Sequence, residues 1–370
     1  YIHSDVNKTR SSVTYEKVTK THPHYPGRMD HLYLHDAEAA AIPGEYKIDL
    51  EYRRGSFMKY CIAIDGGGTK TDTVLFDTEG NILARHVGPG NNPTDIGCDE
   101  ARKRLMEDID AVYHNAGGAV ETLYGGIAGT LPNGDIYSDE ISRRYDIRCI
   151  RIEDDGCNLI SGAFGHADGC GMVCGTGSSL FVRREGQPLR HIGGKGYMID
   201  TGGSGFEIGR DAICMALRAA DGRTEHTVLQ ELLGEMLGCP VDDRVIPMVH
   251  RGGRPYIASF AAAVFAGRRM GDCVCEEIFQ RQSALMADLT YAAQTSFDGG
   301  FNVVAGGGIV SHFPEYFEAI KQKSAPGANL VLQNAPPVYG AAAEAMWNAG
   351  EPVTEGFRAR FLEAYAQAQK

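Results

Sequence analysis

Two glycine-rich turns carry the residues in this sequence that could do chemistry. The first, "IDGGGTKT", has Asp65 at the end of an apolar run, followed by glycines, threonines and a lysine. The second, "VCGTGSS", has a similar composition further along the chain. Glycines let a backbone approach an anion closely, and N–H and hydroxyl groups can donate hydrogen bonds to it. Each turn is therefore a candidate phosphate site, with a purely structural hairpin as the alternative.

The first turn matches neither of the two familiar nucleotide motifs. A P-loop has glycine and lysine in direct succession before serine or threonine, whereas Thr69 separates Gly68 from Lys70 in the order Gly68-Thr69-Lys70-Thr71 here. A dinucleotide fingerprint leads into a helix, whereas the strand-like run "DTVLF" follows this turn. The runs "YCIAI", "DTVLF" and "ILARHV" predict a three-stranded antiparallel meander. Because a second strand–turn–strand unit recurs, we expect two lobes that present matching turns to one ligand.

Paired carboxylates lie between the two turns. The strand-like run "CIRIE" ends at Asp154 and Asp155, and an amphipathic helix is expected to follow. A carboxylate at this junction is held by the backbone, which suits a general base, although either residue could instead cap the helix. Later, "VVAGGGI" predicts a strand, a turn at 306–308 and a helix, and a flat ring could lie against that turn.

Composition excludes several classes of function. The formal charge of −12 argues against nucleic acid or an anionic membrane as a partner. No stretch approaches the roughly 20 apolar residues that span a bilayer. The 10 cysteines contain no CxxC pair, which favours free thiols and a cytoplasmic location.

The first 57 residues differ from the rest of the chain in composition. They hold no cysteine, and Met58 stands directly before the first strong strand, "KYCIAID". We interpret residues 1–57 as a non-essential extension, with translation starting naturally at Met58 as one hypothesis. The rival hypothesis is a short appended β-rich element, because "EYKIDLEY" alternates like a strand. Intact extension on the purified native protein would refute the first hypothesis.

The order of the motifs resembles that of the BadF/BadG/BcrA/BcrD-type ATPase family and, within it, the N-acetylglucosamine kinase branch. The resemblance covers about Met58 to Asn348 and includes "GGKGYMIDTGGSGFEIGRDA" and "PPVYGAA". It implies a two-lobed actin-like ATPase fold (ribonuclease H-like), in which each lobe is a mixed five-stranded sheet with flanking helices and ATP lies between the lobes. The N-terminal lobe would span 58–168 and the C-terminal lobe 169–370.

The resemblance also implies a role for each motif. Asp155 would be the catalytic base and a sugar contact, and Asp65 would hold Mg²⁺ through water. The residues expected on the ATP phosphates are Gly67, Gly68, Thr69, Lys70, Gly175, Thr176, Gly177 and Ser178. Those expected on the adenosine are Gly306, Gly307, Gly308, Tyr339 and Gly340. Those expected on the sugar, besides Asp155, are Asn92, Gly194, Asp200 and Thr201.

The sugar segment departs from the family pattern. Sugar kinases of this type read Gly-Asp-Glu-Gly-Ser, whereas this chain reads Asp200-Thr201-Gly202-Gly203-Ser204. The expected activity is transfer of the ATP γ-phosphate to a hydroxyl of N-acetylglucosamine or a related amino sugar, with Mg²⁺. Alternatives are an ATPase activator of a radical dehydratase and a non-catalytic nucleotide or sugar sensor. A homodimer is also expected, because dimers are common in families of this kind.

Overall fold

The computed structural model describes residues 58–200 and 202–368, so the hypotheses on residues 1–57 and the sugar contact expected of Thr201 lie outside the described residues. The strands are β1 Tyr60–Gly66, β2 Lys70–Asp77, β3 Ile82–Pro89, β4 Val120–Ile127, β5 Ile147–Glu153, β6 Gly169–Cys174, β7 Ser178–Arg183, β8 Arg190–Ile192, β9 Phe301–Gly306 and β10 Ala328–Leu332. The helices are α1 Pro93–Ile96, α2 Cys98–Tyr113, α3 Thr130–Asn133, α4 Ser138–Arg144, α5 Asp155–Phe164, α6 Gly205–Ala220, α7 Leu229–Leu237, α8 Val245–Ser259, α9 Ala261–Arg269, α10 Cys273–Gln294, α11 Gly308–His312, α12 Pro314–Lys323, α13 Pro337–Asn348 and α14 Glu355–Gln367.

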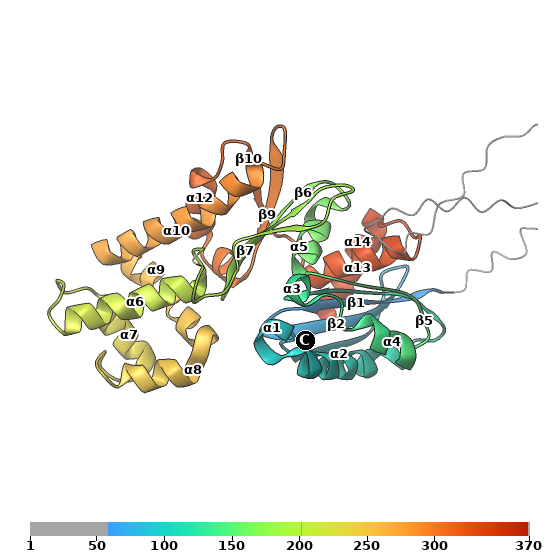
Figure 1. Cartoon of the computed structure of the whole chain (residues 1–370), viewed down its shortest axis with the longest axis horizontal. Coiled ribbons are helices and arrows are strands. Elements are labelled where there is room, and N and C mark those ends of the chain that lie inside the picture. Colours follow the sequence, from blue (N-terminus) through green and yellow to red (C-terminus); the bar gives the residue numbers. More distant parts are fainter. Residues whose placement is uncertain (1–57, 201, 369–370) are drawn as a thin grey trace, which may run out of the picture. The chain divides into compact units, whose positions relative to one another are not determined.

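Two five-stranded sheets repeat one topology (Figure 1). The first has the order β3-β2-β1-β4-β5, and β1 pairs antiparallel with β2 and parallel with β4. The second has the order β10-β9-β6-β7-β8, and β6 pairs antiparallel with β7 and parallel with β9. The predicted meander and the predicted pair of mixed five-stranded sheets are therefore confirmed. In each sheet the central strand ends in one of the two glycine turns.

The first sheet is buried on both faces, and the sequence of β1 shows why. Side chains alternate between the faces of a strand. Ile62 and Ile64 pack in a cluster with Leu105 and Ile109 of α2. Cys61 and Ala63 pack in the cluster on the other face. Burial on both faces explains the nearly continuous apolar run that precedes Asp65.

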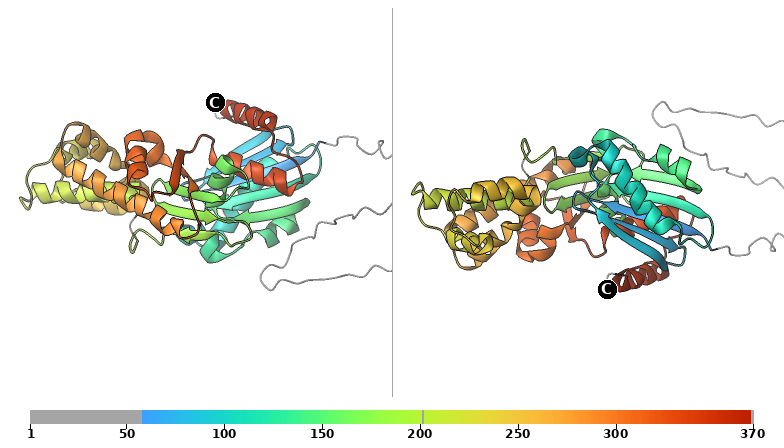
Figure 2. Two further views of the ribbon diagram at one scale, coloured as in Figure 1. Left: turned by 90° about the horizontal axis from the view of Figure 1, so that it is seen from above. Right: turned by 90° about the horizontal axis from the view of Figure 1, so that it is seen from below.

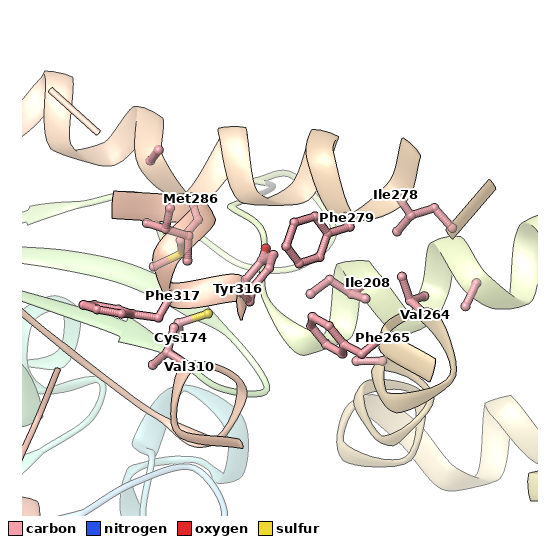
Figure 3. Close-up of a cluster of buried hydrophobic side chains, with 14 of the residues drawn as sticks. Cys174, Ile208, Val264, Phe265, Ile278, Phe279, Met286, Val310, Tyr316 and Phe317 are labelled. Carbon is pink, nitrogen blue, oxygen red and sulfur yellow. The ribbon is translucent and has the colours of Figure 1, made fainter. Parts of the chain in front are cut away.

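The second sheet is supported by a large aromatic core (Figure 3). Phe265, Phe279 and Tyr316 are fully buried, and the rings of Phe265 and Phe279 each meet that of Tyr316 edge to face. Cys174, the last residue of β6, lies in the same core. The Tyr316 hydroxyl donates to the Gly203 carbonyl at 2.8 Å, so this core also fixes the segment that leads into α6.

The last two helices pack against the first sheet, although they follow the second sheet in sequence (Figures 1 and 2). Tyr339 of α13 and Phe361 of α14 are buried in one cluster with Cys61 and Phe76 of the first sheet. The predicted assignment of the whole segment 169–370 to the C-terminal lobe therefore does not match the packing, because the apolar sides of these helices find their partner on β1 and β2. The division into two domains stays a prediction.

A buried ion pair fastens α14 to the first sheet. Asp72 of β2 is 1% exposed and accepts two hydrogen bonds from Arg85 of β3, at 2.9 and 2.7 Å. It also accepts one from the Tyr365 hydroxyl of α14 at 2.5 Å. Arg85 and Tyr365 lie outside the glycine turns, whereas Asp72 directly follows the first turn and its charge raises the pKa of Asp65.

We expect Arg85→Met to lower the free energy of unfolding by about 3–5 kcal/mol, because it leaves a buried carboxylate without its counter-ion. Urea denaturation followed by circular dichroism would measure the loss. The control is the double variant Asp72→Asn/Arg85→Met, which removes the charge and should recover part of the stability. A single variant as stable as the parent protein would contradict the assignment.

Among the described residues, none of the helices has both the length and the apolar character needed to cross a membrane. All ten cysteines belong to the described part of the chain, and all are free.

Candidate active site

The first glycine turn is held open by its own backbone. The Gly67 N–H donates to the Lys70 carbonyl at 2.9 Å, and the Gly67 carbonyl accepts from the Asn91 N–H at 2.9 Å. Gly68, Thr69 and Lys70 are exposed. The turn thus presents its backbone, the threonine hydroxyl and the lysine to solvent, while β1 and β2 fix its two ends.

The second glycine turn is attached to the start of α6. The Gly175 N–H donates to the Gly177 carbonyl at 2.9 Å. The Gly175 carbonyl accepts from Gly205 N–H at 2.8 Å, and the Thr176 carbonyl accepts from Phe206 N–H at 3.2 Å. A capping box at Ser204 completes the helix start, since its backbone N–H donates to Glu207 at 2.8 Å. The second turn is therefore fixed to the start of a 16-residue helix.

The third glycine turn touches the second. Gly307 has φ +109°, and a Cβ atom at this position would lie 2.5 Å from the Cys174 carbonyl oxygen. Only glycine fits both the backbone conformation and the contact. Gly308 begins α11 directly after it, and Gly306 ends β9.

The three turns meet at one cavity of about 410 Å³. Its lining residues are Thr69, Gly175, Thr176, Pro255, Ala258, Ser259, Gly308 and Ile309. The first and third glycine motifs contribute one residue each, Thr69 and Gly308, and the second contributes Gly175 and Thr176. The predicted phosphate residues of the two sheets and the start of α11 are thus brought together, and the second half of α8 supplies a wall that the sequence did not predict.

Three carboxylates gather beside the first turn. Asp65 is the penultimate residue of β1, Asp154 precedes α5 and Asp155 is the first residue of that helix. Burial raises the pKa of Asp155 well above its usual range, and the neighbouring Asp154 and Asp65 charges raise it further. Burial also raises the pKa of Asp65 to about 6. A carboxylate with a raised pKa is a stronger base when it is ionised, which suits proton abstraction from a hydroxyl.

Asn158 orients Asp65, and the sequence analysis missed it. Its side-chain amide is fully buried and donates to Asp65 Oδ1 at 2.9 Å and to the Gly126 carbonyl at 3.2 Å. It lies one helical turn after Asp155, on the same helix. The hydrogen bond favours the ionised form of Asp65 and opposes part of the rise in its pKa. The signal available in the sequence was its spacing of three residues from Asp155.

Asn158→Leu is expected to raise the pKa of Asp65 further above about 6, because the carboxylate loses this donor while remaining buried. The Mg²⁺ binding predicted for Asp65 needs its ionised form and should then weaken about tenfold per pH unit below that pKa. The acid limb of Mg²⁺-dependent nucleotide binding should therefore move to higher pH. Ser161→Ala, which removes another buried hydrogen bond of α5, is the control for loss of stability. An acid limb at the parent position in Asn158→Leu would contradict this role.

The residues predicted to contact the sugar have defined partners. Asn92 caps α1, and its Oδ1 accepts from the Thr94 N–H at 2.9 Å. Asp200 Oδ2 accepts from the Lys195 N–H at 3.0 Å. Gly194 is exposed, and a Cβ there would lie 2.9 Å from His191 Nε2. None of these residues lines the described cavity, so their contact with a sugar stays a prediction.

His191 connects this segment to the carboxylates. Its ring stacks on Phe181 with centroids 4.6 Å apart, and Phe181 in turn packs against Gly156 of α5. Burial lowers the pKa of His191, and the positive charge of Lys195 lowers it further, against the opposing effect of Asp154 and Asp200. In the sequence, no spacing typical of a metal-binding or ligand-binding motif marks this histidine.

The contact of Tyr339 and Gly340 with the adenosine stays a prediction. Both are buried in α13, and a Cβ at Gly340 would lie 1.8 Å from the Asn158 carbonyl oxygen. Gly340 therefore permits the close crossing of α13 over α5. Tyr339 packs in the core beneath β1, and Arg358 covers its ring. The structure does not bring these two residues to the lining of the cavity, unlike Gly308.

The fold and the arrangement of three glycine turns around one cavity define an actin-like ATPase fold. A solved structure from Chromobacterium violaceum, provisionally named an N-acetylglucosamine kinase, has a TM-score of 0.61 at 23% identity and covers 76% of this chain and 97% of that one. A ROK family glucokinase from Streptomyces griseus has a TM-score of 0.51 at 19% identity, over 78% of this chain and 98% of that one.

The sequence profile of the BadF/BadG/BcrA/BcrD ATPase family matches residues 62–345, and the chain belongs to that family. An N-acetyl-D-glucosamine kinase of Dictyostelium discoideum is 33% identical over 204 residues, which are 50% of this chain and 62% of that protein. An N-acetylmuramic acid/N-acetylglucosamine kinase of Clostridium acetobutylicum is 29% identical over 231 residues, which are 60% of this chain and 75% of that protein.

Proposed function

We propose that this chain is an ATP-dependent kinase that transfers the γ-phosphoryl group to a hydroxyl of N-acetylglucosamine or a related amino sugar. The observation that carries the proposal is the meeting of the three glycine turns at one cavity, with Asp65 and Asp155 beside the first turn. The names of the relatives from Dictyostelium and Clostridium support an amino sugar as the acceptor.

The residues around the cavity fit a nucleoside triphosphate. Two turns offer backbone N–H groups, and Thr69 and Thr176 add hydroxyls from the two sheets. Gly307 leaves room where any side chain would enter the second turn. The predicted contacts of the phosphates with Gly67, Lys70, Gly177 and Ser178 belong to the same proposal, as does contact of the adenosine with Gly306 and Gly308.

Asp65 fits the expected role of holding Mg²⁺ through water. Within residues 58–200 and 202–368, no group of three or more His, Cys, Asp or Glu side chains could hold a metal ion. Mg²⁺ needs no such cage, because one or two carboxylates, water and substrate phosphates commonly complete its coordination. When bound, the ion would neutralise charge on the phosphates.

The side chains of this site would divide the work of phosphoryl transfer. Asp155 would orient the acceptor hydroxyl and take its proton as the new O–P bond forms and the bond between the β- and γ-phosphates breaks. Asn158 would keep Asp65 oriented and ionised. The N–H groups of the two turns would hold the phosphates in line with the acceptor hydroxyl. The hydrogen bonds between the second turn and the start of α6 would keep those N–H groups in place.

The dehydratase activator is disfavoured by its own chemistry. Activators of this kind carry a cysteine that holds an iron–sulfur cluster shared by two subunits, three residues before the first glycine of the second turn. This chain has Met172 at that position, and its side chain is fully buried. The nearby Cys170 and Cys174 are also 0% exposed, and burial raises the pKa of Cys170 to about 12. Neither thiol is placed to ligate iron at a subunit surface.

A panel of acceptors tests the proposal. ADP release would be measured with Mg²⁺-ATP and N-acetylglucosamine, glucosamine, glucose or N-acetylmannosamine. We expect release that depends on an amino sugar, and the preferred acceptor would identify what the unusual segment at 200–202 recognises. ADP release that is the same with every sugar and without sugar would contradict the proposal.

A further inference from the structure

Arg254 stands at a break in α8. Gly253 has φ 64° and ψ −163°, so the helix is interrupted immediately before this arginine, and Pro255 follows it. The guanidinium carbon lies 4.9 Å from the centroid of the Tyr197 ring, and the side chain is 33% exposed. Its Nε atom is buried and has no hydrogen-bond partner among the described residues.

The guanidinium lies beside the second phosphate turn and faces the first through Asp95. A Cβ at Gly177 of the second turn would be 3.2 Å from Arg254 Nη2. Asp95 Oδ1 is 3.7 Å from Nη1, and a Cβ at Gly68 of the first turn would be 3.6 Å from Asp95 Oδ2. The next residue, Pro255, lines the cavity together with Thr69, Gly175 and Thr176.

The contact with Asp95 does not satisfy this arginine. At 3.7 Å the pair is an ion pair without a hydrogen bond, and both side chains are partly exposed, at 33% and 43%. Such pairs contribute little. A guanidinium has five N–H donors in a planar fork, and this geometry suits phosphate oxygens. Within the described part of the chain, no hydrogen bond from the Arg254 side chain competes with such a ligand.

We propose that Arg254 is a catalytic residue that binds the γ-phosphoryl group of ATP, exchanging its loose contact with Asp95 for the phosphate oxygens. This inference rests on the proposed function. The guanidinium stays protonated throughout and stabilises charge on the transferred group as its bond to the β-phosphate breaks and its bond to the acceptor oxygen forms. It thereby adds a cation on the side of the second turn, whereas Lys70 is expected to act from the first.

The test compares Arg254→Met with Arg251→Met, an exposed arginine on the same helix. We expect Arg254→Met to lower kcat for sugar-dependent ADP release about 10²–10³-fold, the scale for loss of one preorganised charge-stabilising group. The KM for the sugar should stay within twofold of the parent value. The affinity for a non-hydrolysable ATP analogue should fall about tenfold, whereas the affinity for ADP should not change. Arg251→Met should match the parent protein in all four quantities.

A second variant and a rescue keep the test decisive. Guanidinium ion added to Arg254→Ala should restore part of kcat, which a purely structural role would not allow. If Arg254→Met fails to bind ADP, Arg254→Gln replaces it, because glutamine stays polar but lacks the charge, and a glutamine variant with parental kcat and parental discrimination between ADP and the ATP analogue overturns the inference. The same parental values in Arg254→Met overturn it as well. A parent protein without sugar-dependent turnover refutes the proposed kinase, and the nucleotide affinities then decide separately on the contact with the γ-phosphate.

Discussion

Replacing Asp155 with asparagine is expected to lower kcat for sugar phosphorylation by about 10²–10⁴-fold, the usual contribution of a general base. The fold and nucleotide affinity should survive, because asparagine has the same shape and the three glycine turns are untouched. The reason for the large effect is that burial and the neighbouring carboxylates raise the pKa of Asp155, so the ionised form is a strong base beside the first turn. Steady-state kinetics and an ATP titration would separate these quantities.

Asp154→Asn is the matched control, because it makes the same replacement of a carboxylate with an amide at the adjacent residue. Asp154 is 4% exposed and accepts from the Leu131 N–H at 3.4 Å. Losing its charge should lower the pKa of Asp155, since the Asp154 charge raises it. The acid limb of kcat should then move to lower pH. The opposite pattern, with activity abolished in Asp154→Asn and retained in Asp155→Asn, would assign the base to Asp154.

Gly307→Ala is expected to weaken nucleotide binding and to lower stability. The residue has φ +109°, and the new methyl group would lie 2.5 Å from the Cys174 carbonyl oxygen and 3.0 Å from the Gly175 nitrogen. The second turn or the start of α11 must therefore move. We expect a KM for ATP raised about tenfold or more, because a shift on the order of 1 Å near reacting groups can change rates about 100-fold. Stability should fall by about 1–3 kcal/mol.

Gly271→Ala separates backbone strain from displacement of the turn. Gly271 also has positive φ, +87°, but a Cβ there would meet nothing within 4 Å. This control should lose some stability and leave the KM for ATP unchanged. The two variants would be compared by thermal unfolding and by ATP-dependent kinetics. Equal values of KM for ATP in Gly307→Ala, Gly271→Ala and the parent protein would show that the third turn does not shape the nucleotide site.

The central strands and their turns could be predicted because their signals are local. The apolar run "CIAI" and the glycines after it predict β1 and its turn, and "GMVCGTGSSLFV" predicts β6 and β7 in the same way. Both patterns depend only on neighbouring residues, and the structure contains the strands that they predict. The junction of β5 and α5 at Asp155 is of the same kind.

Contacts between distant segments could not be predicted in this way. Nothing in the segment "PPVYGAA" indicates that its helix, α13, crosses α5 closely at Gly340. No sequence motif marks Arg254. Its proposed role depends on the kink at Gly253 and on turns that are far away in sequence. Asn158 likewise acquires a role only when β1 and α5 come together.

The most direct test of the kinase assignment follows the phosphoryl group itself. The protein would be incubated with Mg²⁺-ATP and N-acetylglucosamine or glucosamine, and the products followed by phosphorus NMR. The expected result is a sugar phosphomonoester that grows in step with ADP and is absent in Asp155→Asn. Formation of inorganic phosphate and ADP alone, at a rate indifferent to the sugar, would contradict the assignment and leave only an ATPase.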